Sequence, residues 1–323
     1  MEQMKLTFVN VGYGEAILIE CPDPDCEDGT FVMLIDGGST ELSEYADNTS
    51  GRVPFSEYLT ERGIRHIDLM VSTHPHEDHI CGLFPVVKQV VPTVYWQALN
   101  AENLRMQMLD PAMAETVSHQ KFLSALNDCC EMLKLLEEGG CRIQSMKAGD
   151  SGELCAGLRY TVLAPSAERC ADLCSSLQEL YDETDVDKLT QLDRVMNNYS
   201  LMLMLDYRGT RILLPGDTNS EGFGEIDPAT LKADIYKVGH HGQKDGASHT
   251  LLEMVQPKAV VCCASSDRRY NSADPQMLAM MAHQGAELWF SDCPLVEHTT
   301  IPPHRALTFM VGGDGEFSAE YIL

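Results

Sequence analysis

Six consecutive residues, His74 to His79 (HPHEDH), place three imidazoles and two carboxylates in one short stretch of the chain. The apolar run before them, Ile67 to Val71 (IDLMV), predicts a short buried strand. The stretch therefore begins where a strand ends, which is the usual position of a functional site in folds that combine sheets and helices. Because imidazole and carboxylate bind divalent metals, the spacing H-x-H-x-D-H predicts a site for two neighbouring ions rather than a polar surface loop.

The bulk composition is typical of a globular protein with a large core: 323 residues, 44% hydrophobic and 22% charged. No apolar run approaches the ~20 residues that a membrane helix needs, so we expect no membrane partner. Residues Met1 to Lys5 lack the basic and apolar regions of a signal peptide. The twelve cysteines are scattered and form no C-x-x-C pair, which disfavours both a disulfide framework and a cysteine zinc site. We therefore predict a cytoplasmic location.

Acidic residues outnumber basic ones by 49 to 23, which gives a formal net charge of −26. Because Lys and Arg hold phosphate backbones, this balance argues against extended nucleic acid as a partner. We expect a small-molecule or locally bound anionic substrate, since bound metal ions would offset part of the acidic charge at the site. Solubility of the folded chain explains most of the remaining acidic residues.

Apolar and alternating runs predict strands at both ends of the chain, with helices interspersed. The expected strands cover residues 5–9, 16–20, 31–35, 67–71, 93–96, 159–163, 200–206, 211–214, 235–238, 259–262, 287–290, 306–311 and 317–323. Helical insertions are expected at about 97–150 and 166–195. The sequence leaves three roles open for the second insertion: a lid, a surface that binds a partner, or a segment that only fills space. The pattern predicts a single α/β (α+β) domain over residues 1–323, with two sheets face to face and helices outside.

Two strands farther along the chain also end at candidate ligands. The apolar run 212–214 leads into Pro215-Gly216-Asp217, and the run 235–238 leads into Gly239-His240-His241-Gly242. A carboxylate can bridge two cations, and a further imidazole can complete the coordination of one of them. Three strand-end clusters in one chain favour a shared metal site over three unrelated turns.

Three motifs follow one another along the chain: H-x-H-x-D-H, then G-D, then H-H-G. Their order resembles that of the metallo-β-lactamase superfamily and, within it, that of the soluble ComEC-like catalytic domain. Residues 11–16 (VGYGEA) are similar to the V-G-Q-G-D-A opening of that group, and residues 34–38 (LIDGG) and 198–200 (NYS) are similar to two of its later segments. The resemblance extends from about residue 5 to residue 292, without the helical insertions. It implies a four-layer αββα sandwich with two metals at one edge.

The resemblance also implies the ligands. One metal would be held by His74 and His76, the second by Asp78, His79 and either His240 or His241, and Asp217 would bridge the two. Neighbours on an extended segment point apart, so one histidine of the pair would face the substrate, and we favour His241 as the ligand.

Three residues are expected to support the ligand side chains without binding a metal themselves. Asp36 would be an acceptor that orients a ligand histidine, and Glu15 would either do the same or be a solvated acid at the start of a strand. Asn198, or its neighbour Asn197, stands near the place where many superfamily members have a sixth ligand, a histidine. The first metal would then have fewer protein ligands. His119 is interpreted as a surface residue at a helix start rather than as a replacement ligand.

The implied function is hydrolysis by a dinuclear centre that uses zinc or, as the second choice, manganese. A water between the ions would lose a proton near neutral pH and attack a phosphodiester or other ester-type bond. Asp78 could accept the proton, and the free histidine of the pair could stabilise charge on the substrate. The alternatives are a non-hydrolytic metal-binding regulatory or interaction protein on the same fold, and a ComEC-like nuclease, which the net charge of −26 disfavours.

Overall fold

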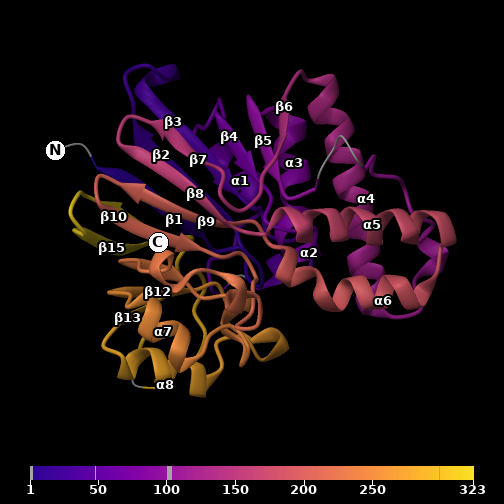
Figure 1. The fold of residues 1–323 in the computed structure, drawn as a ribbon. Coiled ribbons are helices and arrows are strands. Elements are labelled where there is room, and N and C mark those ends of the chain that lie inside the picture. The colour runs from indigo at the N-terminus through magenta and orange to yellow at the C-terminus, as the bar shows by residue number, and fades with distance from the viewer. Residues whose placement is uncertain (1–2, 48, 100–103, 298) are drawn as a thin grey trace.

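The computed structural model describes residues 3–47, 49–99, 104–297 and 299–323 and contains two β-sheets (Figure 1). An eight-stranded sheet has the order β15-β14-β1-β2-β3-β4-β5-β6, and a seven-stranded sheet has the order β13-β12-β11-β10-β9-β8-β7. The strands of the first sheet are β1 (Met4–Val9), β2 (Ile17–Pro22), β3 (Thr30–Ile35), β4 (Leu69–Val71), β5 (Val94–Gln97), β6 (Arg142–Ser145), β14 (Ala306–Val311) and β15 (Phe317–Ile322). Those of the second are β7 (Ser151–Cys155), β8 (Leu158–Ala164), β9 (Met202–Tyr207), β10 (Thr210–Leu214), β11 (Ile235–Lys237), β12 (Ala259–Cys262) and β13 (Glu287–Phe290).

Helices cover the outer face of each sheet. The first sheet is covered by α1 (Phe55–Glu61), α2 (Glu77–Ile80), α3 (Leu83–Gln89), α4 (Val117–Glu138), α5 (Ala167–Glu183) and α6 (Val186–Val195). The second is covered by α7 (His249–Val255) and α8 (Pro275–His283). Within the described ranges, no helix has both the length and the apolar character needed to cross a bilayer.

Each strand divides its side chains between two hydrophobic layers, because successive residues point to opposite faces of a sheet. In β3, Met33 and Ile35 join the cluster between the two sheets, whereas Val32 and Leu34 join the layer of α1 to α6. β9 divides in the same way between the inner cluster and the layer of α7 and α8. Sheets buried on both faces need nearly continuous apolar strands, which is the pattern of the sequence. The predicted αββα sandwich is confirmed.

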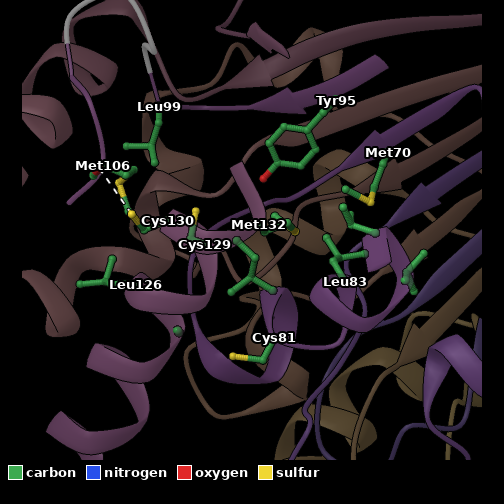
Figure 2. Close-up of a cluster of buried hydrophobic side chains, with 14 of the residues drawn as sticks. Met70, Cys81, Leu83, Tyr95, Leu99, Met106, Leu126, Cys129, Cys130 and Met132 are labelled. Atoms are coloured by element: carbon green, nitrogen blue, oxygen red, sulfur yellow. Dashed lines mark hydrogen bonds between the residues drawn. The ribbon is translucent and has the colours of Figure 1, made fainter. Parts of the chain in front are cut away.

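The predicted insertions fold as α4, α5 and α6, which we call the inserted helices. Leu126, Cys129 and Met132 of α4 pack with Tyr95 of β5 and Met70 of β4 in one cluster (Figure 2). Buried residues of α5 and α6 belong to the same cluster, so the inserted helices and the first sheet share a continuous core. Figure 1 shows α5 and α6 side by side at one end of the molecule, next to α4. Residues 100–103 of the first insertion lie outside the described residues.

Two edge strands correct the prediction. Residues Arg142–Ser145, predicted as part of a helical insertion, form β6, which pairs in parallel with β5. Residues Ser151–Cys155, for which no strand was predicted, form β7 at the edge of the other sheet. Neither strand is buried on both faces, and β6 contains a single apolar residue, Ile143, so neither carries the hydrophobic period that identified the central strands. The strand predicted at 67–71 is shorter, as β4 begins at Leu69.

A backbone crossing holds α2 against the end of β3. A Cβ at Gly82 would lie 1.9 Å from the Gly37 carbonyl oxygen, and a Cβ at Gly37 would lie 2.5 Å from the Leu83 nitrogen. The Gly37 N–H donates to the His79 carbonyl at 2.7 Å, and the Gly82 N–H donates to the Gly38 carbonyl at 2.8 Å. Only glycine permits this approach, which fixes the second half of the HPHEDH motif relative to Asp36 at the end of β3.

Gly82→Ala is therefore expected to lower the free energy of unfolding by at least about 2 kcal/mol, because the added methyl meets backbone atoms that cannot move aside. Gly224→Ala is the matched control, since a Cβ at Gly224 would contact nothing within 4 Å. Urea unfolding of both variants and of the unchanged protein measures the difference. Equal stability of all three would contradict the crossing.

Candidate metal centre

Strand ends from both sheets meet at one edge of the sandwich. β3 and β4 are parallel neighbours in the first sheet, and β10 and β11 are parallel neighbours in the second. The carboxyl ends of parallel neighbours lie at the same edge of a sheet. Asp36 follows β3, the HPHEDH motif follows β4, Asp217 follows β10, and His241 follows β11. The fold thus brings together residues that are far apart in the chain.

Four of these side chains converge. Ligand atoms of Asp78, His79, Asp217 and His241 all lie within 4.8 Å of one another. The Asp217 Oδ2 atom is 2.8 Å from His241 Nε2 and 3.2 Å from His79 Nε2, and the Asp78 Oδ2 atom is 2.9 Å from His241 Nε2. His79, Asp217 and His241 are buried. Two carboxylates and two imidazoles within this distance form a donor set that fits a divalent ion.

The hydrogen bonds behind the two imidazoles define their tautomers. His79 Nδ1 lies 2.7 Å from Asp36 Oδ2, and His241 Nδ1 lies 2.7 Å from the Cys263 carbonyl oxygen. Both partners are acceptors, so each Nδ1 carries a proton and donates. In the neutral imidazole this leaves the Nε2 lone pair directed at the carboxylates, as metal coordination requires.

The four groups also perturb one another's pKa values. Burial alone would lower the pKa of His79 and His241, but the carboxylates of Asp217 and Asp78 outweigh it. The pKa of His79 lies well above its usual value, and that of His241 rises to about 9. Burial alone would raise the pKa of Asp217, but His241, His79 and Lys237 hold it well below its usual range. The cluster therefore keeps its carboxylates ionised and attracts positive charge.

A second pair of imidazoles lies beside this cluster. His74 Nε2 is 3.0 Å from His76 Nδ1. The Thr73 hydroxyl donates to Asp36 Oδ2 at 2.6 Å, so at 3.0 Å from His74 Nδ1 it acts as an acceptor. His74 therefore carries its proton on Nδ1 and presents the Nε2 lone pair toward His76. Burial, followed by the neighbouring His79 and His76, holds the pKa of His74 well below its usual value, so the His74 imidazole is neutral.

Asp36 connects the two pairs. Its Oδ1 accepts the Thr73 N–H at 2.8 Å, and its Oδ2 accepts from both the Thr73 hydroxyl and His79 Nδ1. It contacts His79 directly and His74 through Thr73. This is the place that the sequence analysis expects for a residue that orients ligand histidines.

Lys237 is a buried cation that the sequence analysis missed. Its Nζ donates to Asp217 Oδ1 at 3.1 Å and to the Gly216 carbonyl at 2.8 Å, and it forms an ion pair with Glu15. Lys237 and Glu15 are both fully buried, so the interpretation of Glu15 as a solvated acid is wrong. The signal available in the sequence was a lysine inside the apolar strand before the H-H-G segment.

The adjacent histidines take different positions. His241 belongs to the converging cluster, whereas His240 lies in the wall of the neighbouring pocket with its Nδ1 2.8 Å from Asp245 Oδ1. Both residues have left-handed backbone conformations, with φ of 46° for His240 and 51° for His241. Such conformations are uncommon outside glycine and occur at functional sites, where the surrounding structure maintains them.

Two other predicted positions differ from expectation. The Asn198 side chain accepts the Asn219 N–H at 3.4 Å, and it is Asn197 that lines the pocket. His119 lies at the start of α4 as predicted, but it is buried and its Nε2 lies 2.9 Å from the Thr190 hydroxyl, so its interpretation as a surface residue is wrong. It joins α4 to α6 and is not among the grouped ligands of the described residues.

A pocket of about 290 Å³ opens beside the two histidine pairs. Asp78 lines it from α2, Asp217 and His240 line it from the loops after β10 and β11, and Ser118, Lys121 and Asp193 line it from the inserted helices. Tyr13 and Tyr270 form a further part of the wall, with ring centroids 5.0 Å apart. The inserted helices are therefore part of the pocket and do not merely decorate the fold.

The sequence matches the family model of the metallo-β-lactamase superfamily over residues 9–266. The chain belongs to the metallo-β-lactamase superfamily. The fold of this superfamily implies divalent metal binding, and the converging donors of this chain fit such ions. The predicted superfamily is confirmed.

Among curated relatives, the ComE operon protein 3 of Bacillus subtilis (strain 168) is 23% identical over 297 residues, which cover 89% of this chain and 32% of that protein. The chain thus spans about a third of the length of this relative. The match confirms the predicted ComEC-like resemblance. Among solved structures, Zn²⁺-bound PqqB from Methylobacterium extorquens is 12% identical, covering 88% of this chain and 98% of that one, with a TM-score of 0.45. A diphosphatase of the PhnP family is 13% identical, covering 93% and 100%, with a TM-score of 0.43.

The Glu15–Lys237–Asp217 arrangement yields a stability prediction. Lys237→Met is expected to lower the free energy of unfolding by about 3–5 kcal/mol, because it leaves two buried carboxylates without their cation. Adding Glu15→Gln to the same protein removes one of those charges and should recover much of the loss. Urea unfolding of the two single variants and the double variant, after chelation, gives the coupling energy. Independent, additive effects would show that the ion pair does not form.

Proposed function

We propose that this superfamily member is a dinuclear metal-dependent hydrolase that cleaves a phosphodiester or other ester-type bond of a small or locally bound anionic substrate. The convergence of Asp78, His79, Asp217 and His241 within 4.8 Å carries the proposal, and the lone pairs of His74 and His76 beside it support a second ion. A cytoplasmic location belongs to the same proposal, supported by twelve free thiols.

In this proposal His74 and His76 would hold the first ion, Asp78, His79 and His241 would hold the second, and Asp217 would serve both. Zinc suits this imidazole-rich set best, and manganese is the second choice for a first site with few protein ligands. Bound there, the two ions supply Lewis acidity and an activated water near neutral pH.

The protein contributes orientation and proton transfer. Asp36 fixes His79 and, through Thr73, His74, so that their Nε2 atoms stay directed at the site. Asp78, which lines the pocket and would also bind the second ion, would accept the proton of the attacking water and return it to the leaving oxygen as the ester bond breaks. His240, held by Asp245, contacts the substrate oxygens on which charge develops.

The size of the pocket supports a small substrate, and its charge makes the binding of an anionic substrate depend on metal. Its volume of about 290 Å³ is at the lower end of the range for small-molecule sites. The carboxylates of Glu77, Asp78, Asp193 and Asp217 line it, against the ammonium of Lys121. Such a pocket repels anions until divalent cations bind, so substrate binding depends on metal loading.

The first test is elemental analysis of protein purified without chelators or added metal. We expect about two equivalents of zinc or manganese per chain, and turnover of bis(p-nitrophenyl) phosphate by the loaded protein. Asp217→Ala should lose metal and turnover together, because it removes the bridging carboxylate. Glu253→Ala, at an exposed position of α7, should retain both. Turnover retained in Asp217→Ala would refute the assignment, and tight metal binding without turnover of any ester would favour the non-hydrolytic binding protein.

A competition experiment separates this proposal from the ComEC-like nuclease. Among the described residues that line the pocket, Lys121 is the one lysine or arginine, which gives a phosphate backbone little to bind. A single-stranded oligonucleotide should therefore not inhibit hydrolysis of the small diester at about 0.15 M salt. Inhibition that weakens steeply as salt is raised would instead support the nuclease.

A further inference from the structure

The inserted helices place one carboxylate directly behind a candidate metal ligand. Asp193, near the end of α6, has its Oδ1 3.2 Å from His76 Nε2. His76 and Asp193 are largely buried, with 18% and 22% of their side-chain surface exposed. His76 Nε2 is the ring nitrogen opposite the one that faces His74. The contact lies behind the proposed ligand atom, where it can determine which nitrogen carries the proton.

The position of Asp193 is itself fixed by neighbouring helices. Its second oxygen, Oδ2, accepts from the Ser118 hydroxyl of α4 at 2.9 Å. One turn earlier on α6, Thr190 contacts the buried His119 of α4 at 2.9 Å. The two contacts join α4 to α6 at Asp193 itself and one turn before it. The carboxylate therefore belongs to a braced pair of helices and not to a mobile surface.

This arrangement matters because the two proposed metal sites are built differently. The Asp78–His79–His241 site takes its ligands and their hydrogen-bond partners from strand ends and from α2. The first site has only His74 and His76 in addition to the bridging carboxylate. A carboxylate that holds a ligand imidazole fixes its tautomer and ring orientation and strengthens it as a ligand. A site with few ligands depends most on such a partner.

We propose, on the basis of the proposed dinuclear function, that Asp193 is the positioning residue for His76 and that the inserted helices complete the first metal site. With its proton on Nε2, 3.2 Å from Asp193 Oδ1, His76 keeps its Nδ1 lone pair directed toward His74 Nε2. The inserted helices thus determine whether the ion of the first site is bound. Their docking couples the occupancy of the first site to the wall of the substrate pocket.

The test is a stepwise titration of the whole protein with each of two metals. Binding of Zn²⁺ is measured by calorimetry and binding of Co²⁺ by its visible absorption, and both titrations give the stoichiometry. Asp193→Ala should bind one equivalent as the unchanged protein does and the other about 10–100-fold more weakly. Asp193→Asn keeps an acceptor oxygen without the charge, so it should weaken the same equivalent by less. Asp187→Asn, an exposed site on the same helix, makes the same charge change and should bind both equivalents normally.

The outcomes separate this inference from the function on which it rests. Two equivalents bound normally by Asp193→Ala and Asp193→Asn would overturn the inference and leave the hydrolase proposal standing. Equal weakening of both equivalents in Asp193→Asn would also overturn it, because the effect would then not be local to the first site. An unchanged protein that binds fewer than two equivalents would overturn both proposals.

Discussion

The buried carboxylate of Asp217 is the charge around which the site is organised. It lies within 3.2 Å of a nitrogen on His79, which follows β4 in the first sheet, and of nitrogens on Lys237 and His241, at the end of β11 in the second sheet. An ionised carboxylate in the interior costs several kcal/mol unless such partners surround it. Because these partners come from both sheets, the carboxylate can be accommodated only when the two sheets and the loops at these strand ends are in place. The sandwich and the site are therefore stabilised together.

Much of the fold and part of the site were predictable from the sequence, for a geometric reason. Central strands are buried on both faces, so they appear as apolar runs whose ends can be located within a few residues. Side chains at the ends of such runs, such as those of Asp217 and His241, meet at one edge of the sheets because parallel strands align their carboxyl ends. Asp36 was predictable in the same way. The edge strands β6 and β7 were not, because a half-exposed strand carries little hydrophobic signal.

The residues that were missed or misplaced depend on tertiary contacts that leave no local pattern. Glu15 had two readings because nothing near it in sequence reveals Lys237, the cation that makes its burial possible. His119 looked like a surface residue because its partner, Thr190, lies on another helix. The choice between Asn197 and Asn198 depends on the direction of a short helical turn, which the sequence does not encode at single-residue precision. For Glu15 and His119 the deciding contact joins segments that are distant along the chain.

The inserted helices contribute both to the packed core and to the candidate site. A long insertion can be tolerated at the surface of a sandwich at modest entropic cost, and many such insertions would stay peripheral. Here the buried residues of α4, α5 and α6 are continuous with the core on the first sheet, so their orientation is as well determined as that of the strands. Helices held in this way can support a ligand histidine, as a loose lid could not. The same packing that orders the inserted helices places Asp193 beside His76, and it places Ser118, Lys121 and Asp193 in the wall of the pocket.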